Sequence, residues 1–313
     1  MTGAAKTEPT IRAPEPAPGH APGPGELLRA VRALELVARR NVASLATGDY
    51  ATSILGRGLV FHEPRKYVAG EPARYIDWNA TARLGEPYVK VHQEERQREI
   101  FLAVDVSPSM HTGFQDKTKL EHAVELTATL AVSAVETGDR VGCVLFADTA
   151  LAVERPLAGK RHLFRVLRTL LEHTARWTRP VTESDPRAAI HAIQQLRGRR
   201  FVVFLISDFI DHDVPEDLKY VQARHDVALL HVYDPVEYAA TDAVRFPAYA
   251  PEGSHRRVSL RPGESGTLEE IEGFLRREAG RHRIAVEPFP TDEPVSRSLT
   301  RLFHRRRRRR RVR

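Results

Sequence analysis

Residues 99–109 read EIFLAVDVSPS, a nearly continuous apolar run that ends in an aspartate, two serines and a proline. A strand that is apolar at almost every position is typical of a parallel sheet whose two faces are both covered by helices. Proline and serine directly after such a strand favour a turn. We therefore expect a buried strand over 100–106 that delivers polar side chains to one edge of a parallel sheet.

Strand and helix alternate along the chain after this strand. Thr118 and Glu121 form a Thr-x-x-Glu capping box that begins a helix, and Gly138 ends it. This repeated alternation predicts an α/β fold with a doubly wound, mostly parallel sheet of the Rossmann type, whose most apolar strand should be central. The predicted strands are 141–146, 201–206 (the most apolar) and 227–233, and the predicted helices are 162–172, 186–196 and 214–224.

Composition divides the chain into four segments. Residues 1–24 are rich in proline and glycine and almost lack large apolar side chains, which predicts disorder. Residues 25–98 should form a helix over 26–40 and a small β-rich lobe. Residues 99–304 form the α/β domain, and 305–313 are a basic tail of eight arginines and one valine.

Most of the net charge lies in that tail. The formal net charge of +7 is smaller than the charge of the eight tail arginines, so the rest of the chain is close to neutral. A neutral body argues against nucleic-acid binding through the folded domain and leaves an anionic partner open for the tail. The single cysteine, Cys143, excludes an internal disulfide, and no apolar run reaches the ~18–20 residues of a membrane span. We therefore expect a cytoplasmic protein.

A candidate metal site follows the first strand. Asp105, Ser107 and Ser109 occupy alternate positions, and a turn there would bring one carboxylate and two hydroxyls together. These are hard oxygen ligands, which suit Mg²⁺ or Mn²⁺ better than zinc. In a doubly wound sheet, ligands bind at the carboxyl ends of the strands near the point where the strand order reverses. The sequence therefore predicts a divalent-cation site at this edge.

Later segments supply further oxygen ligands to the same edge. Asp208 directly follows the strand over 201–206, and Thr182 or Ser184, just before a helix, offers a third hydroxyl. The pattern resembles the metal-ion-dependent adhesion site of von Willebrand factor A-like domains. That resemblance implies direct contact of the hydroxyls with the metal and a water-mediated role for Asp208. It favours Ser184, in the stretch SDPRAAI, over Thr182 as the third hydroxyl.

A second motif precedes the first strand, where residues 65–83 read RKYVAGEPARYIDWNATAR. This run resembles the family called domain of unknown function 58. The agreement spans about 26–303 and includes GDRVG (138–142), SDF (207–209), HDV (225–227) and DPVE (234–237). Lys66 departs from the family's usual glutamate, and Glu71 from its aspartate. The motif residues are Arg65, Tyr67, Gly70, Arg74, Asp77, Trp78 and Arg83.

Two interpretations of this motif stay open. Its arginines, with Asp77 and Trp78, could form a buried network of guanidinium–carboxylate and guanidinium–ring contacts that fastens the lobe to the sheet. Alternatively, they line a surface that receives an acidic partner or a phosphate. We favour the buried network, because the lobe has no periodic core of its own.

The resemblance implies an adaptor rather than an enzyme. It points to a metal-dependent protein-binding module that works with a MoxR-type AAA+ ATPase in a chaperone-like assembly or activation system, with an unidentified protein target. One alternative is a metal-dependent phosphoester hydrolase with Asp105 as nucleophile; such enzymes usually carry a second aspartate where this chain has Ser107. Another alternative is a tether to nucleic acid or anionic membrane through the arginine tail.

Overall fold

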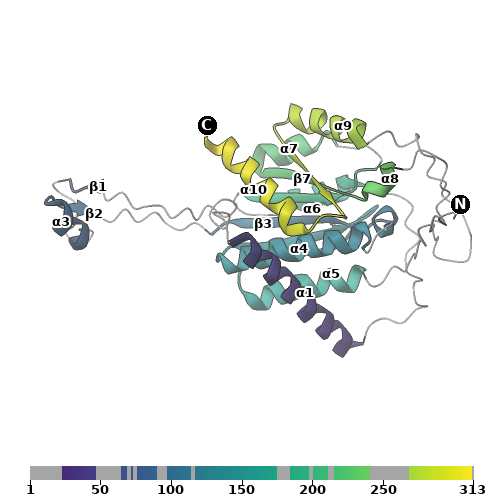
Figure 1. Cartoon of the computed structure of the whole chain (residues 1–313), viewed down its shortest axis with the longest axis horizontal. Helices are drawn as coiled ribbons and strands as arrows, with labels where there is room; N and C mark the ends of the chain where they lie inside the picture. The colour runs from purple at the N-terminus through teal and green to yellow at the C-terminus, as the bar shows by residue number, and fades with distance from the viewer. Residues whose placement is uncertain are drawn as a thin grey trace, which may run out of the picture.

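A computed structural model describes most of the α/β domain and parts of the N-terminal region (Figure 1). The predicted disorder of the N-terminus falls on residues 1–22, which lie outside the described ranges. No helix in the described part of the chain is both long and apolar enough to cross a membrane. The described residues are 23–46, 65–68, 72, 76–89, 97–113, 117–174, 184–196, 200–210, 215–239 and 268–311.

A six-stranded sheet forms the centre of the molecule. Its order is β5-β4-β3-β6-β7-β8, and every neighbouring pair is parallel except β4 and β5. The order reverses between β3 and β6, so the doubly wound, mostly parallel fold is confirmed. The strands are β3 (Glu99–Asp105), β4 (Arg140–Phe146), β5 (Ala150–Leu157), β6 (Phe201–Ser207), β7 (Asp226–Tyr233) and β8 (Ala285–Pro290).

Helices cover both faces of this sheet, as the apolar strands require (Figure 1). Alternate residues of β3 point to opposite cores: Leu102 packs with one set of helices and Phe101 with the other. The first core contains residues of α1 (Pro24–Ala46), α4 (Lys119–Glu136), α5 (Lys160–Thr174) and α10 (Val295–Arg311). The second core contains residues of α6 (Pro186–Gln194), α7 (Leu218–Arg224) and α9 (Leu268–Arg281).

The N-terminal helix belongs to the α/β body. Val31, Ala38 and Leu45 of α1 are buried in the same core as α4 and α5. The helix also extends to Ala46 rather than ending near residue 40. The boundary predicted at residue 98 therefore separates α1 from the helices against which it packs.

A small unit between α1 and β3 contains the described part of the family motif. It consists of β1 (Arg65–Lys66), α3 (Trp78–Leu84) and β2 (Tyr88–Val89), with β1 and β2 antiparallel. The Tyr67 amide donates to the carbonyl of Pro87 at 2.8 Å, and the Asp77 amide donates to the carbonyl of Tyr88 at 2.7 Å. In Figure 1 this unit is drawn away from the sheet.

The predicted buried network is wrong for Trp78, whose side chain is 68% exposed. Two-residue strands and a two-turn helix offer too little apolar surface to enclose an indole ring. Lys66, which replaces the family's glutamate, instead pairs with Glu86. Arg83 donates to the carbonyl of Asn79 at 3.3 Å. Gly70, Arg74 and the side chain of Arg65 lie outside the described residues.

The C-terminal helix includes most of the basic tail. The sequence indicates an anchored helical turn that ends near Phe303, but α10 continues to Arg311. Arg305 pairs with Glu287 at 3.2 Å, and Arg306 pairs with Asp226, which begins β7. The Arg306 guanidinium also lies 5.4 Å from the centre of the Phe204 ring. The first tail arginines therefore contribute to the fold at the amino-terminal edge of the sheet.

Candidate metal site

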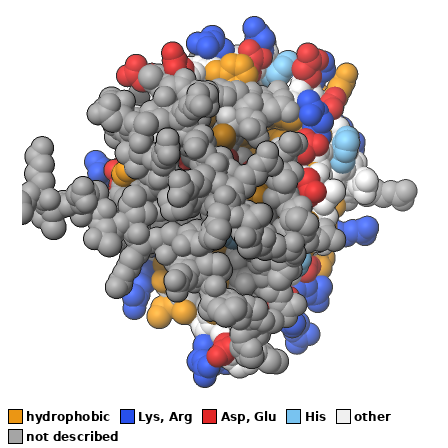
Figure 2. Space-filling view, turned by 90° about the vertical axis from the view of Figure 1, so that its right-hand side faces the viewer, with side chains coloured by type: hydrophobic (Ala, Val, Ile, Leu, Met, Phe, Trp, Pro, Cys, Tyr) orange, Lys and Arg blue, Asp and Glu red, His pale blue; other side chains and the backbone are white. Residues whose placement is uncertain are grey.

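The candidate site lies at the carboxyl ends of β3 and β6, where the strand order reverses. Asp105 is the last residue of β3, Ser207 is the last residue of β6, and Asp208 follows directly. Charged side chains of both signs are interspersed among the described residues around this face of the molecule (Figure 2). The ends of two neighbouring strands bring these polar side chains to one edge of the sheet.

Asp105 is fully buried and surrounded by hydrogen-bond donors. Its Oδ1 accepts from the backbone amide of Ser107 at 2.9 Å. Its Oδ2 accepts from the hydroxyls of Ser184 and Ser207, each at 2.7 Å. The structure thus brings Ser184 to the predicted place, whereas Thr182 lies outside the described residues. Ser207, which the sequence did not predict to belong to the site, ends β6 beside Asp105.

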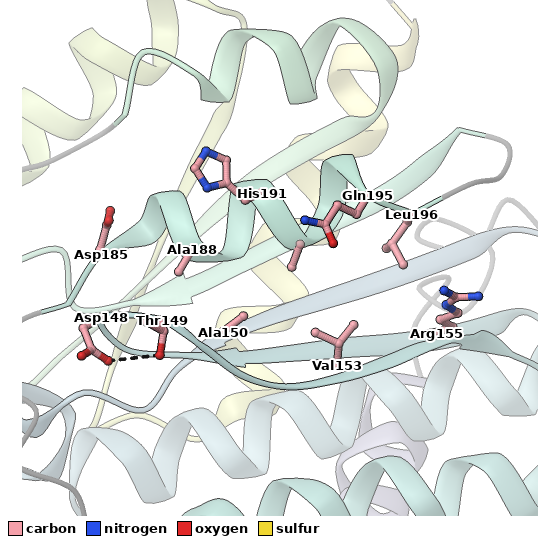
Figure 3. Close-up of a pocket in the computed structure, with 11 residues that line it drawn as sticks. Asp148, Thr149, Ala150, Val153, Arg155, Asp185, Ala188, His191, Gln195 and Leu196 are labelled. Carbon is pink, nitrogen blue, oxygen red and sulfur yellow. Dashed lines mark hydrogen bonds between the residues drawn. The ribbon is translucent and has the colours of Figure 1, made fainter.

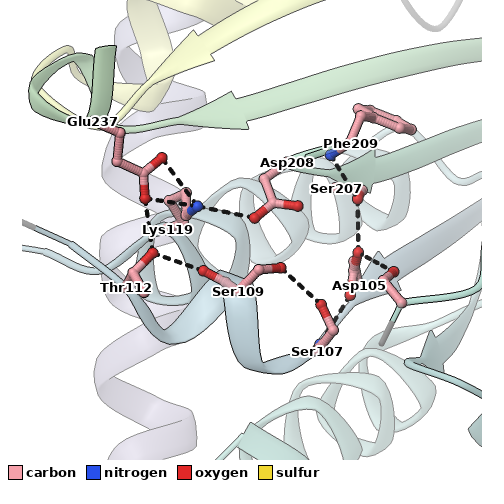
Figure 4. A network of polar contacts seen from close by, with 10 residues as sticks. Asp105, Ser107, Ser109, Thr112, Lys119, Ser207, Asp208, Phe209 and Glu237 are labelled. Carbon is pink, nitrogen blue, oxygen red and sulfur yellow. Dashed lines mark hydrogen bonds and ion pairs between the residues drawn. The ribbon is translucent and has the colours of Figure 1, made fainter. Parts of the chain in front are cut away.

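Ser107 and Ser109 stand on the loop that follows β3. The turn is a short 3₁₀ helix, Pro108–His111, with Pro108 at its first position, where a missing amide hydrogen costs nothing. The Ser107 hydroxyl makes no capping hydrogen bond and instead lies 3.1 Å from the Ser109 hydroxyl. Both hydroxyls are therefore directed to one location beside Asp105 (Figure 4).

These oxygens fit the coordination of a small divalent cation. Mg²⁺ binds oxygen at about 2.0–2.1 Å in an octahedron, so neighbouring ligands lie roughly 3 Å apart. The Ser107–Ser109 hydroxyl separation of 3.1 Å and the Ser184–Asp105 separation of 2.7 Å are close to that spacing. No group of three or more His, Cys, Asp or Glu side chains suited to a metal occurs in the described part of the chain. Within the described residues, the candidate metal ligands are therefore the oxygens of Asp105 and the neighbouring serines.

Asp208 is held by Lys119, a residue that the sequence did not predict to belong to the site. Its Oδ2 accepts from Lys119 Nζ at 2.9 Å, and Lys119 also pairs with Glu237 Oε1 at 2.8 Å. Lys119 is fully buried at the first position of α4, directly after the Thr118 cap. A lysine is unfavourable beside the positive end of a helix dipole. That mismatch was the available sequence signal for a special role.

The electrostatics of the two aspartates differ. Burial, assisted by the negative charge of Asp208, raises the pKa of Asp105 from 3.8 to about 6. Burial alone would lower the pKa of Lys119, but Asp208 and Glu237 more than offset it and raise that pKa. Burial also raises the pKa of Glu237, although Lys119 opposes the shift. With all four groups ionised, the cluster has two excess negative charges.

Backbone strain marks the same location. Phe209, directly after Asp208, has a φ of 48°, in the left-handed region that bulky side chains rarely adopt. Its amide donates to the Ser207 hydroxyl at 3.1 Å, which helps to hold this conformation. Such strain persists where the surrounding structure imposes it, commonly at functional sites. It fixes the direction in which the chain leaves β6 and so places Asp208.

The nearby groove between β5 and α6 is a separate feature. It has a volume of about 580 Å³ and is lined by Asp148, Val153, Asp185, His191 and neighbouring residues (Figure 3). None of the predicted metal-site residues lines it. We therefore centre the candidate function on the polar cluster.

Comparisons with known proteins agree with the sequence motifs. Residues 63–246 match the model of a family described as a protein of unknown function, DUF58. The chain belongs to the DUF58 family. Uncharacterized protein Rv1480 of Mycobacterium tuberculosis is 29% identical over 268 residues, which cover 83% of this chain and 80% of the relative. Uncharacterized protein Mb1516 of Mycobacterium bovis matches to the same extent.

Solved structures similar to this DUF58 protein include BatB from Bacteroides thetaiotaomicron. The likeness has a TM-score of 0.48 and 18% identity, covering 67% of this chain and 99% of BatB. A von Willebrand factor type A protein from Catenulispora acidiphila has a TM-score of 0.37 and 11% identity, covering 67% of this chain and 43% of the other. The assignment to a von Willebrand A-like, Rossmann-type fold rests on the strand order and connections of this chain itself.

Proposed function

We propose that this DUF58 protein is a non-enzymatic, metal-dependent protein-binding adaptor. Asp105, Ser107, Ser109 and Ser184 would hold Mg²⁺ or Mn²⁺, and Asp208 would act on it through water. The cation would accept a carboxylate from a partner protein at its open position. At a site with only oxygen ligands and few protein charges, Mg²⁺ keeps several water ligands that can exchange.

One observation carries this proposal: a buried carboxylate that lacks a counter-ion. Among the described residues, no lysine, arginine or histidine forms an ion pair with Asp105, although it is fully buried. The neighbouring Asp208 has such a partner in Lys119. Burying an unpaired charge is costly, so a site that retains one is suited to an external cation.

The contacts of Asp105 favour a ligand over a nucleophile. Both of its oxygens accept hydrogen bonds, from one amide and two hydroxyls, which hold the carboxylate in place. Phosphoester hydrolases of the type considered above usually carry a second aspartate where this chain has Ser107. The hydroxyl of Ser107 is a metal ligand but a poor proton donor or acceptor at neutral pH.

The partner follows from the family resemblance. A MoxR-type AAA+ ATPase would supply the energy of ATP hydrolysis, and this chain would present or recognise an unidentified protein target. A divalent cation with an open position selects an acidic side chain on that partner. The pair would then act as a chaperone-like system that assembles or activates other proteins.

The test has two parts. Isothermal titration should show Mn²⁺ or Mg²⁺ binding to the wild type and none to Asp105→Ala, while Asp148→Ala, an exposed aspartate at the same sheet edge, binds normally. Capture of partners from the native cell should recover an AAA+ ATPase in Mg²⁺ and lose it in EDTA or with Asp105→Ala. Recovery that is indifferent to both EDTA and the substitution would refute the metal-dependent mechanism. Turnover of phosphoesters lost on Asp105→Asn would establish the hydrolase instead.

A further inference from the structure

The DPVE motif at 234–237 supplies Glu237, the partner of Lys119 in the polar cluster. It places Glu237 on the short helix α8 (Pro235–Ala239), directly after β7. Figure 4 shows the Glu237 side chain beside the metal-site loop. Its carboxylate contacts two side chains, and each of them leads to a different segment of the candidate site. The segment that follows β7 therefore also contacts the site, in addition to the segments that follow β3 and β6.

The first connection runs through Lys119 to Asp208. Lys119 Nζ lies 2.8 and 3.1 Å from the two Glu237 oxygens and 2.9 Å from Asp208 Oδ2. With one oxygen engaged, Asp208 can turn only its other oxygen toward Asp105 and the serines. The lysine thereby fixes which oxygen faces a bound cation.

The second connection runs through Thr112 to Ser109. The Thr112 hydroxyl lies 2.8 Å from Glu237 Oε1 and 2.8 Å from the backbone carbonyl of Ser109. A hydroxyl has one hydrogen and donates it to one acceptor at a time. Glu237 and the Ser109 carbonyl therefore compete for the same proton, so a displacement of one segment changes the bonding of the other.

Burial makes this arrangement rigid. The side chains of Lys119, Asp208 and Glu237 are 0, 2 and 7% exposed. Removing one member of a buried ion pair leaves an uncompensated charge, so each of the three holds the other two in place. Simple neutralisation of Asp208 would need only the lysine and would not need Glu237 to reach Thr112.

We propose that Glu237 and Lys119 are positioning residues: they hold the side chains of the metal site in place, and they couple binding of the cation to the position of α8. They fix the position of Asp208 relative to the Ser109 loop. A cation that attracts Asp208 therefore changes the contacts of Glu237. Because coupling is reciprocal, a ligand that fixes α8 also tightens metal binding. This inference rests on the proposed function, since it concerns the same cation.

The experiment removes the connection without changing the charge of the cluster. Lys119→Met combined with Glu237→Gln deletes one positive and one negative charge, and Lys219→Met with Glu216→Gln does the same to an exposed pair. We expect Mn²⁺ affinity, measured by titration, to fall roughly 10–100-fold in the first double variant, as for other groups that orient metal ligands. The control pair is distant from the site, so the Mn²⁺ affinity of that double variant should stay within about twofold of the wild-type value.

A second variant and a second readout separate positioning from folding. Thr112→Val, at a partly buried position, removes only the hydroxyl that links Glu237 to Ser109 and should still weaken Mn²⁺ binding. Hydrogen exchange of the α8 amides should slow on Mn²⁺ addition in the wild type and respond less in Glu237→Gln. Wild-type affinity in both the Lys119/Glu237 double variant and Thr112→Val, or the same α8 response in Glu237→Gln, would overturn the inference.

The outcome also distinguishes this inference from the proposed function. If the wild type binds no Mn²⁺, or if Asp105→Ala binds it unchanged, the proposed function fails and the coupling fails with it. If Asp105→Ala loses binding while the Lys119/Glu237 double variant retains it, only the positioning role is wrong.

Discussion

The buried, unpaired carboxylate of Asp105 should make the metal-free protein less stable than a variant without that charge. Asp105→Asn keeps the size of the side chain and an acceptor for the Ser107 amide, whose bond to Asp105 measures 2.9 Å. The hydroxyls of Ser184 and Ser207 can rotate to accept from the new amide group instead of donating. We therefore expect the substitution to stabilise the protein in EDTA at neutral pH, although it removes a metal ligand.

The magnitude follows from the pKa of Asp105. Burial raises this pKa from 3.8 to about 6, so between these pH values the unfolded chain is ionised at Asp105 while the native state still holds the proton, and above pH 6 both states are ionised. The ionised native state then costs about 3 kcal/mol, the free-energy equivalent of the shift. Below the ordinary pKa both states are protonated and the penalty disappears; at pH 5 about half of it remains.

The assay is urea unfolding of the wild type and Asp105→Asn at pH 7.5 and pH 5, with EDTA and with excess Mg²⁺. In EDTA at pH 7.5 the variant should be more stable by about 1–3 kcal/mol, and the difference should shrink at pH 5. Mg²⁺ should stabilise the wild type by mass action and leave the variant unchanged. Asp208→Asn provides the matched contrast: it leaves Lys119 with Glu237 alone and should destabilise the protein.

A specific result would refute the reasoning. If Asp105→Asn is no more stable than the wild type at pH 7.5 in EDTA, or if its advantage grows as the pH falls, burial does not leave Asp105 in need of a cation. If the two asparagine variants shift stability in the same direction, the proposed difference between the two carboxylates does not exist.

Two further predictions concern the amino-terminal edge of the sheet. His225 accepts a hydrogen bond from the Phe201 amide at 3.1 Å and stacks on its ring, and burial lowers the pKa of His225 to about 4. Between pH 6.5 and 4 only the unfolded state gains this proton, so the stability of the wild type should fall as the pH is lowered through this range. In thermal melts over the same range, His225→Asn should lose about 1–2 kcal/mol less stability than the wild type. Equal dependence of stability on pH in the two proteins would contradict this. Arg306→Ala should lower the Tm by about 3–6 °C because it removes the ion pair with Asp226, whereas Arg161→Ala, which removes the same charge from an exposed position, should change it little; equal shifts would exclude a structural role for Arg306.

The central elements could be predicted from sequence because their apolar runs are continuous. β3 and β6 are buried along nearly their whole length, and their ends place Asp105 and Asp208 at one edge. β5 was missed because it is an antiparallel edge strand with exposed residues along its length, including a bulge against β4. The extent of α10 was also missed: an arginine run carries no apolar period, so nothing in it marks where the helix stops.

The residues around the site show a different limit. Ser207 ends an apolar strand, and its contact with Asp105 depends on the register between β3 and β6, which pairs Val104 with Ile206. Lys119 begins a helix that a capping box already explains, and only its unfavourable place beside the helix dipole hints at another role. Its partner Glu237 is 118 residues away in the chain. Such contacts follow from topology, which local patterns do not specify.

The difference between the two aspartates bears directly on mechanism. A symmetric pair of free carboxylates would suit either metal binding or hydrolysis, because either one could act as ligand, base or nucleophile. Here Lys119 neutralises Asp208 from within the protein, and Glu237 balances the lysine. Asp105 retains its charge, three hydrogen-bond donors and no counter-ion among the described residues. An external cation would therefore be held mainly by Asp105 and the hydroxyls, with few protein charges on it, and would remain a strong acceptor for the carboxylate of a partner. That distribution of charge favours an adaptor whose binding to its partner depends on the metal.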